Sequence, residues 1–173
     1  MNILFLCTGN SARSILGEAL ATTRSHGRLR GFSAGSHPGG KVNPYAAELC
    51  AQMNYPAQHL RSKSWDEFAA PGAPVMDIIV TVCDSAAGEA CPLWLGHPST
   101  AHWGLPDPAA VDGSDLDKRA AFRAIRDAMA ARIDMLLALP IETLPRDELR
   151  AAMQRIGDAR VLDAAAEVFW VSH

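Results

Sequence analysis

The sequence predicts an α/β protein built on a parallel sheet with helices on both faces. Two observations carry this prediction. Short apolar runs end at turn residues, and they alternate with segments in which apolar residues recur at helical spacing. The chain has 173 residues, enough for one full domain and short for two, and it is 49% hydrophobic and 20% charged. These proportions are those of an ordinary globular protein.

The first strand and the first helix flank a short loop. The apolar run at 2–6, NILFL, is predicted to be a buried strand. The segment 14–27, SILGEALATTRSHG, is predicted to be a helix, with Ser14 as its N-cap and Gly27 just past its last turn.

A second strand and a second helix follow. Residues 30–35, RGFSAG, fit a short strand, and residues 43–53, NPYAAELCAQM, fit a helix. Asn43 is a favoured capping residue, and Pro44 stands at the first helical position, where its missing N–H costs no hydrogen bond.

The next two strands lie in the middle of the chain. The segment 77–82, DIIVTV, is the clearest strand of the sequence, and it runs directly into Cys83. Residues 100–104, TAHWG, fit a fourth strand.

Two helices complete the predicted elements. From Ser114 to Leu139 apolar residues recur at helical spacing, Ser114 and Asp117 form a capping box, and Pro140 ends the helix. The segment 145–157, PRDELRAAMQRIG, fits a further helix.

Charge and composition limit the classes of function. The formal net charge is −3 and no basic block stands out, so nucleic acid is not an expected partner. We see no secretory signal and no apolar run near the roughly 20 residues that cross a bilayer, so we expect a cytoplasmic protein without membrane contact. In a reducing compartment the four cysteines begin as thiols; they are Cys7, Cys50, Cys83 and Cys91.

The loop between the first strand and the first helix carries the strongest chemical signal. It reads CTGNSARS, and it sets Cys7 and Arg13 in a Cys-x5-Arg spacing. Successive backbone N–H groups of such a loop can converge on an anion, and the following helix adds its partial positive charge. Gly9 and Asn10 are the residue types that most readily adopt the positive φ of a tight loop.

The side chains of this loop suit a nucleophile facing an oxyanion. Arg13 supplies a planar fork that matches two oxygens of a tetrahedral anion. Cys7 at the base should be a thiolate at neutral pH, and the Ser14 hydroxyl could hydrogen-bond it. A buried core thiol is the alternative for Cys7, which the neighbouring residues disfavour. The expected anion-binding residues are Thr8, Gly9, Asn10, Ser11, Ala12, Arg13 and Ser14.

The Cys-x5-Arg-Ser loop resembles the signature of the low-molecular-weight protein tyrosine phosphatase family. Asp107-Pro108 resembles the Asp-Pro that this family carries late in the chain. The resemblance implies that Cys7 attacks the substrate, that Arg13 binds the anion and that Asp107 acts as general acid.

The same resemblance sets the expected architecture. It covers residues 1–139 and implies a four-stranded parallel sheet flanked by helices. Residues 140–173 exceed the family core, and we expect them to form a helical C-terminal extension.

Two further segments, CDSAAGEACPLW and TAHWGLPDPAAV, resemble the arsenate reductases built on this phosphatase fold, especially those coupled to thioredoxin. Cys83 and Cys91 are the cysteines of the first segment. In the phosphatases an aromatic residue commonly follows the Asp-Pro and lines a phosphotyrosine pocket, whereas Ala109 and Ala110 follow it here.

The reductase resemblance implies a relay of three thiols and no tightly bound cofactor. Cys7 attacks arsenate, and Cys83 then attacks Cys7, so that arsenite leaves and a disulfide remains. Cys91 attacks Cys83 and moves the disulfide to a Cys83–Cys91 pair. Thioredoxin is the implied external donor, with glutaredoxin or glutathione as alternatives.

Two alternatives remain open. A phosphatase that hydrolyses phosphate monoesters through a Cys7 phosphoenzyme would use the same loop, since phosphate and arsenate are nearly isosteric. Phosphate and sulfate are therefore expected as competing oxyanions. A zinc site from Cys83, Cys91, His97 and His102 is disfavoured because the spacing lacks the short pairs of structural zinc sites, so no metal is expected.

The remaining candidates are a cysteine and a lysine. Cys50 lies on the apolar face of its predicted helix and is interpreted as a packed core thiol. Some relatives bind potassium beneath the loop through its asparagine, a helix glutamate and a later aspartate. Asn10 and Glu18 match the first two, whereas Trp65 stands where the aspartate would fall, with Lys63 nearby. The hypothesis is that the Lys63 ammonium replaces the ion; a solvated surface lysine is the alternative.

Overall fold

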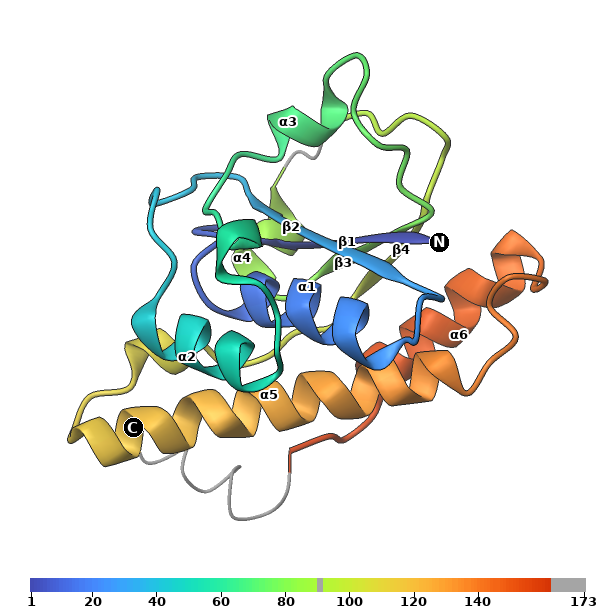
Figure 1. Cartoon of the computed structure of the whole chain (residues 1–173). Coiled ribbons are helices and arrows are strands. Elements are labelled where there is room, and N and C mark those ends of the chain that lie inside the picture. Colours follow the sequence, from blue (N-terminus) through green and yellow to red (C-terminus); the bar gives the residue numbers. More distant parts are fainter. Residues whose placement is uncertain (90–91, 163–173) are drawn as a thin grey trace.

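The computed structural model describes residues 1–89 and 92–162, and a sheet of four parallel strands lies at its centre (Figure 1). The strands are β1 (Asn2–Cys7), β2 (Arg30–Gly35), β3 (Ile78–Thr81) and β4 (Ser99–His102), in the spatial order β2-β1-β3-β4. All neighbouring strands pair in parallel. The predicted four-stranded parallel sheet is confirmed, and each strand lies within two residues of its predicted bounds.

Strand β1 lies inside the sheet with β3 directly beside it. The residues Ile3–Leu6 are fully buried, because a strand of a parallel sheet meets apolar side chains on both faces. Leu6 pairs with Thr81 across the two strands, so the chain leaves β1 and β3 at the same edge of the sheet. This register brings Cys7 and Cys83, which are far apart in sequence, to one edge.

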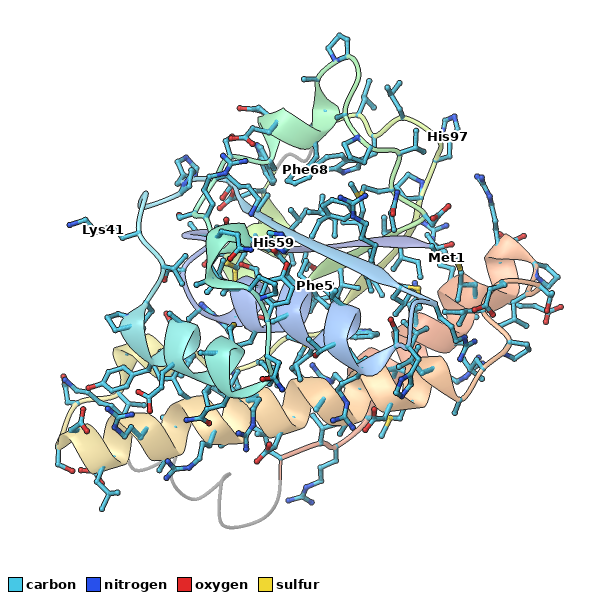
Figure 2. The ribbon with its side chains drawn as sticks, viewed as in Figure 1. Met1, Phe5, Lys41, His59, Phe68 and His97 are labelled. Atoms are coloured by element: carbon cyan, nitrogen blue, oxygen red, sulfur yellow. The ribbon has the colours of Figure 1, made fainter. Side chains whose placement is uncertain are left out.

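Three helices lie on one face of the sheet (Figure 1): α1 (Arg13–Arg24), α2 (Pro44–Gln52) and α5 (Asp115–Leu137). On this side Phe5 extends from β1 toward α1 (Figure 2). It meets the helix at Gly17, where a Cβ atom would lie 2.6 Å from the phenyl ring. A glycine there lets the helix and the strand approach each other, and the larger hydrophobic core forms between them.

The opposite face carries a thinner cover. Helix α3 (Asp66–Ala69) lies over it, and its Phe68 meets Phe32 of β2 edge to face, with 5.7 Å between the ring centroids (Figure 2). Four short elements were not predicted from the sequence: α3 itself, η1 (Ala57–His59), α4 (Asp84–Gly88) and η2 (Pro108–Ala110).

Two predicted helix starts are confirmed. The Asn43 side chain accepts a hydrogen bond from the N–H of Tyr45, with Pro44 at the first position of α2. Ser114 and Asp117 form both halves of the capping box at the start of α5. In both places a local side-chain contact satisfies N–H groups that the helix itself cannot pair.

The predicted N-cap of α1 is wrong. The helix begins at Arg13, and Ser14 lies fully buried inside its first turn. The Ser14 hydroxyl bonds the sulfur of Cys7 and caps no backbone N–H. The Ser14 side chain, which could have capped the helix, is instead used inside the loop.

The predicted helix of the C-terminal extension is confirmed as α6 (Arg146–Asp158). The indole N–H of Trp103 donates to the carbonyl oxygen of Met153 at 2.9 Å. Gly157 lies so close to the end of β4 that a Cβ atom there would overlap the carbonyl oxygen of His102. Helix α6 therefore covers β4, which would otherwise be an open edge strand.

Arg132 of α5 links the segment after β4 to helix α6. Its buried guanidinium donates to the carbonyl oxygens of Gly104, at 3.1 Å, and Gly157, at 2.9 Å. Burial lowers the pKa of this side chain. Within residues 1–89 and 92–162, no helix has both the length and the apolar character needed to cross a membrane.

Candidate active site

The loop that follows β1 wraps around the sulfur of Cys7. The buried Sγ accepts a hydrogen bond from the N–H of Asn10 at 3.1 Å and lies 2.9 Å from the Ser14 hydroxyl. That hydroxyl accepts from the side-chain amide of Asn10, at 2.9 Å, so its own proton is free to point at the sulfur. Two donors therefore face the sulfur of Cys7, at the base of the loop.

Asn10 adopts the positive φ expected of it, at 44°, and its side chain is fully buried. Its amide oxygen accepts a hydrogen bond from the backbone N–H of Lys63 at 2.9 Å, which ties the loop to the segment before α3. The same expectation is wrong for Gly9, whose φ is not positive.

The carbonyl groups of the loop face the surrounding segments. Those of Thr8 and Gly9 accept from the N–H groups of His37 and Gly39, and that of Ser11 accepts from the N–H of Asn43. In a trans peptide unit the C=O and the following N–H point in opposite directions. The N–H groups that follow these three carbonyls, those of Gly9, Asn10 and Ala12, therefore face the interior of the loop, where an anion would lie.

Arg13 and Asp107 meet at the mouth of this loop. One guanidinium nitrogen of Arg13 donates to the carbonyl oxygen of Leu105 at 3.0 Å, and another lies 3.3 Å from the Asp107 carboxylate. The Asp107 side chain also accepts from the N–H of Ala109 at 3.1 Å. The structure thus places the predicted general acid against the predicted anion-binding arginine, although they are distant in sequence.

Cys83 reaches the same site from β3. Its Sγ lies 3.6 Å from the hydroxyl of Thr8 and accepts from the N–H of Ala86, at 3.4 Å, as the N-cap of α4. The side chain is almost fully buried. Cys91, the third predicted thiol, lies outside the described residues.

Cys50 is separate from this group and belongs to the hydrophobic core. It is fully buried on α2, and burial raises its pKa to about 12, with a smaller contribution from the charge of Glu18. A thiol that stays protonated and inaccessible is a poor nucleophile.

A buried charge cluster lies beneath the loop. The Lys63 ammonium is 3.5 Å from the Glu18 carboxylate and donates to the carbonyl oxygen of Arg61 at 2.9 Å. The hydroxyls of Ser33 and Tyr55 also donate to Glu18. Burial lowers the pKa of Lys63, while the Glu18 charge acts in the opposite direction. The solvated-lysine alternative is wrong.

These contacts bear on the potassium site of the relatives. The Glu18 carboxylate, which would bind the ion, already faces the Lys63 ammonium, and a potassium ion beside that ammonium would be repelled. Trp65 packs in the smaller apolar cluster and offers no carboxylate. The donor set does not fit a potassium ion.

The zinc alternative finds no cluster among the described residues, where no three His, Cys, Asp or Glu side chains are arranged to hold a metal ion. His97 lies in the loop before β4, and His102 ends that strand. Cys91, which that set required, lies outside the described residues.

This sheet, with a cysteine loop at the end of β1, defines an enzyme of the low molecular weight phosphatase class. The family model described as low molecular weight phosphotyrosine protein phosphatase matches residues 2–151. The chain belongs to this family.

Its relatives include arsenate reductases, as the sequence resemblance implied. The arsenate reductase of Halalkalibacterium halodurans is 35% identical over 131 residues, which are 76% of this chain and 91% of that protein. A low molecular weight protein tyrosine phosphatase from T. tengcongensis has a TM-score of 0.63 at 20% identity, over 80% of this chain and 98% of that one. A thioredoxin-dependent arsenate reductase from Corynebacterium glutamicum has a TM-score of 0.57 at 20% identity, over 79% and 60%. These two structures show the shared fold.

Proposed function

We propose that the protein reduces arsenate to arsenite through a covalent adduct on Cys7 and a disulfide relay through Cys83 and Cys91. The observation that carries the proposal is the 3.6 Å contact between the Thr8 hydroxyl and the sulfur of Cys83. It sets a second thiol at the rim of the Cys7 loop, where a phosphatase has no use for one. Relatives named arsenate reductase support the same substrate.

In the first step the Cys7 thiolate forms a bond to the arsenic of arsenate, and one oxygen leaves. The inward N–H groups of the loop and the Arg13 guanidinium hold the other oxygens. The departing oxygen is an arsenate hydroxyl, and Asp107 donates the second proton with which it leaves as water. Because Arg13 already contacts Asp107, an arsenate bound to that guanidinium has the acid beside it.

In the second step the Cys83 thiolate attacks the sulfur of Cys7. A sulfur–sulfur bond forms, the sulfur–arsenic bond breaks, and its electron pair stays on arsenic. Arsenic passes from As(V) to As(III) and leaves as arsenite, and the two sulfurs supply the two electrons. The Thr8 hydroxyl and the Ala86 N–H face the sulfur that must act as a thiolate here.

In the third step the Cys91 thiolate attacks Cys83, and Cys7 leaves as a thiolate. An external dithiol then reduces the Cys83–Cys91 disulfide. We propose thioredoxin as the donor, which the thioredoxin-dependent structural neighbour supports, with glutaredoxin or glutathione as the alternatives. The role of Cys91 rests on the sequence resemblance and on thiol–disulfide chemistry.

Hydrolysis of small phosphate monoesters is the second candidate, and it rests on the loop and on Asp107, without the second thiol. Cys7, Arg13 and Asp107 are the groups that a phosphoenzyme mechanism needs, and phosphate or sulfate would compete with arsenate for the same N–H groups. The exposed Ala109 and Ala110 give a phenol ring no aromatic surface, which disfavours phosphotyrosine.

Arsenate-dependent oxidation of NADPH, with thioredoxin and thioredoxin reductase present, tests the proposal. Turnover should disappear in Cys83→Ser and in Cys91→Ser, and it should persist in Cys50→Ala, which removes a core thiol. Turnover that survives in Cys91→Ser would mean that the donor attacks the Cys7–Cys83 disulfide directly. A parallel assay with glutaredoxin and glutathione identifies the donor. Brisk aryl-phosphate hydrolysis independent of Cys83, with no arsenate turnover from any donor, would establish the phosphatase instead.

A further inference from the structure

A second polar cluster lies beside Cys83, and the steps above do not use it. It joins the ends of β3 and β4 to the start of α4. The Thr81 hydroxyl lies 2.8 Å from Nδ1 of His102, and Nε2 of His102 lies 2.9 Å from the Asp84 carboxylate. Asp84 is the residue directly after Cys83 and the first residue of α4.

These two contacts assign a role to each ring nitrogen of His102. The Asp84 carboxylate can only accept, so Nε2 carries the proton of that hydrogen bond. In a neutral imidazole Nδ1 is then an acceptor, and the Thr81 hydroxyl donates to it. Strand pairing also places Thr81 opposite His102, so the ring is oriented from β3 and directed at Asp84.

A glycine makes room for the pair. A Cβ atom on Gly104 would lie 2.8 Å from Nε2 of His102 and 3.1 Å from the Asp84 oxygen. Any other residue would press on both partners at once. Gly104→Ala therefore disturbs the pair without removing either of its members.

Helix α4 depends on outside support. It has five residues, and a helix of that length does not hold itself wound in water. Ala86 is its one buried residue, and Ala86 and Ala87 line a cavity of about 670 Å³ that His102 also borders. The hydrogen bond from His102 holds the otherwise exposed side chain of its first residue.

We infer that His102 is a positioning residue for the second thiol, an inference that rests on the proposed function. By fixing Asp84 it keeps the first turn of α4 wound. The wound turn directs the Ala86 N–H at the sulfur of Cys83 and keeps that sulfur beside Thr8. Without the attachment the turn opens, and Cys83 attacks the Cys7 adduct more slowly.

Single-turnover kinetics in a Cys91→Ser background test this step directly. The enzyme is mixed with arsenate, quenched with an alkylating agent, and the Cys7–Cys83 disulfide is counted by mass spectrometry. His102→Ala and Gly104→Ala should lower the ratio of disulfide formation to aryl-phosphate hydrolysis by about 3-fold, the value of a hydrogen bond between exposed side chains. An unchanged ratio in both variants overturns the inference, whether the two activities persist or fall equally.

Two matched variants sharpen the result. His102→Gln keeps an amide that can donate to Asp84, so it should restore most of the ratio if the role is positioning. Failure of that rescue would contradict the role. His26→Asn alters an exposed histidine in the loop after α1 and should leave the ratio unchanged.

Hydrogen exchange separates this inference from the proposed function. In the substrate-free protein, the backbone amides of residues 86–88 should exchange about 3-fold faster in His102→Ala than in the wild type. Equal exchange overturns the positioning role even if the enzyme reduces arsenate. Faster exchange in a protein that does not turn over arsenate would mean that the proposed function fails while the attachment of α4 stands.

Discussion

The ammonium of Lys63 and the carboxylate of Glu18 form an ion pair of 3.5 Å directly under the nucleophile loop, with only 7% and 6% of their side chains exposed. Tyr55 donates to the same carboxylate, and burial together with that hydrogen bond raises the pKa of Tyr55, so it remains a donor. The backbone of Lys63 in turn fixes Asn10. The loop that holds Cys7 therefore rests on a buried charge pair.

Lys63→Met should destabilise the protein by about 3–5 kcal/mol, because it leaves the Glu18 carboxylate buried without its cation. Urea unfolding measures the change. Combining it with Glu18→Gln should recover part of the loss, since the uncompensated charge is then gone. Lys41→Met is the matched control, because the Lys41 side chain extends into solvent (Figure 2). A loss as small as that of the control would contradict the role of the pair.

Exchanging sodium for potassium in the buffer should leave the thermal midpoint unchanged within about 1 °C, because no binding energy is available to couple the ion to folding. The Lys63 ammonium already neutralises Glu18. Differential scanning calorimetry at matched ionic strength is the measurement. A midpoint that rises with potassium but not with sodium would show that the ion binds after all.

Asp107→Asn should lower the rate of aryl-phosphate hydrolysis by about 100-fold or more, the usual contribution of a positioned general acid. The amide cannot donate a proton to the leaving oxygen, although it can still contact Arg13. The loss should grow as the leaving group becomes more basic. Asp112→Asn, at an exposed aspartate five positions along, is the control. Equal rates for the two variants would remove Asp107 from the mechanism.

The stability of the protein should fall at alkaline pH because of Cys50. Burial raises the pKa of its thiol from 9.0 to about 12. The unfolded chain releases this proton at a lower pH than the folded chain does, so the contribution is complete below pH 9 and is lost as the pH rises toward 12. Between pH 7.5 and pH 10, the wild type should lose about 1.4 kcal/mol more than Cys50→Ala in urea unfolding. Equal losses would show that Cys50 ionises freely in the folded protein.

Gly157→Ala should destabilise the protein by about 1–3 kcal/mol, because the added methyl group overlaps the carbonyl oxygen of His102 and pushes α6 away from β4. The sign is informative, since alanine is intrinsically the better helix former. Gly39→Ala, where a Cβ atom meets nothing within 4 Å, serves as control. A stabilised Gly157→Ala protein would mean that α6 is not held against the strand.

The elements that the sequence predicted are those decided by local signals. The apolar segment 77–82 and the caps at Asn43 and Ser114 depend on neighbours within a few residues. Ser14 was assigned wrongly because two partners compete for its hydroxyl, and the folded loop decides for the sulfur of Cys7. Helix α4 was missed because its few small residues carry no periodic signal and its cap is a thiol.

In the candidate site, too, the residues that could be predicted from the sequence itself are those with a local signal. The spacing of Cys7 and Arg13 is local and could be recognised directly, whereas Asp107 and Cys83 were expected through the family resemblance. The ties of His102 to Asp84 and of Tyr55 to Glu18 could not be predicted, since they join elements that only the fold brings together.

Because β1 pairs with β3, a bond between the thiols of Cys7 and Cys83 would change the stability of the sheet. A disulfide between Cys7 and Cys83 would join the two inner strands at their ends and close a loop of roughly 75 residues. By lowering the entropy of the unfolded chain, it would raise the free energy of unfolding by about 4 kcal/mol. The intermediate that carries this disulfide would then be more stable than the reduced enzyme. Resistance to heat would track how much of the enzyme holds the Cys7–Cys83 bond, which the attack of Cys91 on Cys83 breaks, so each turnover would form and then break a covalent link at the centre of the sheet.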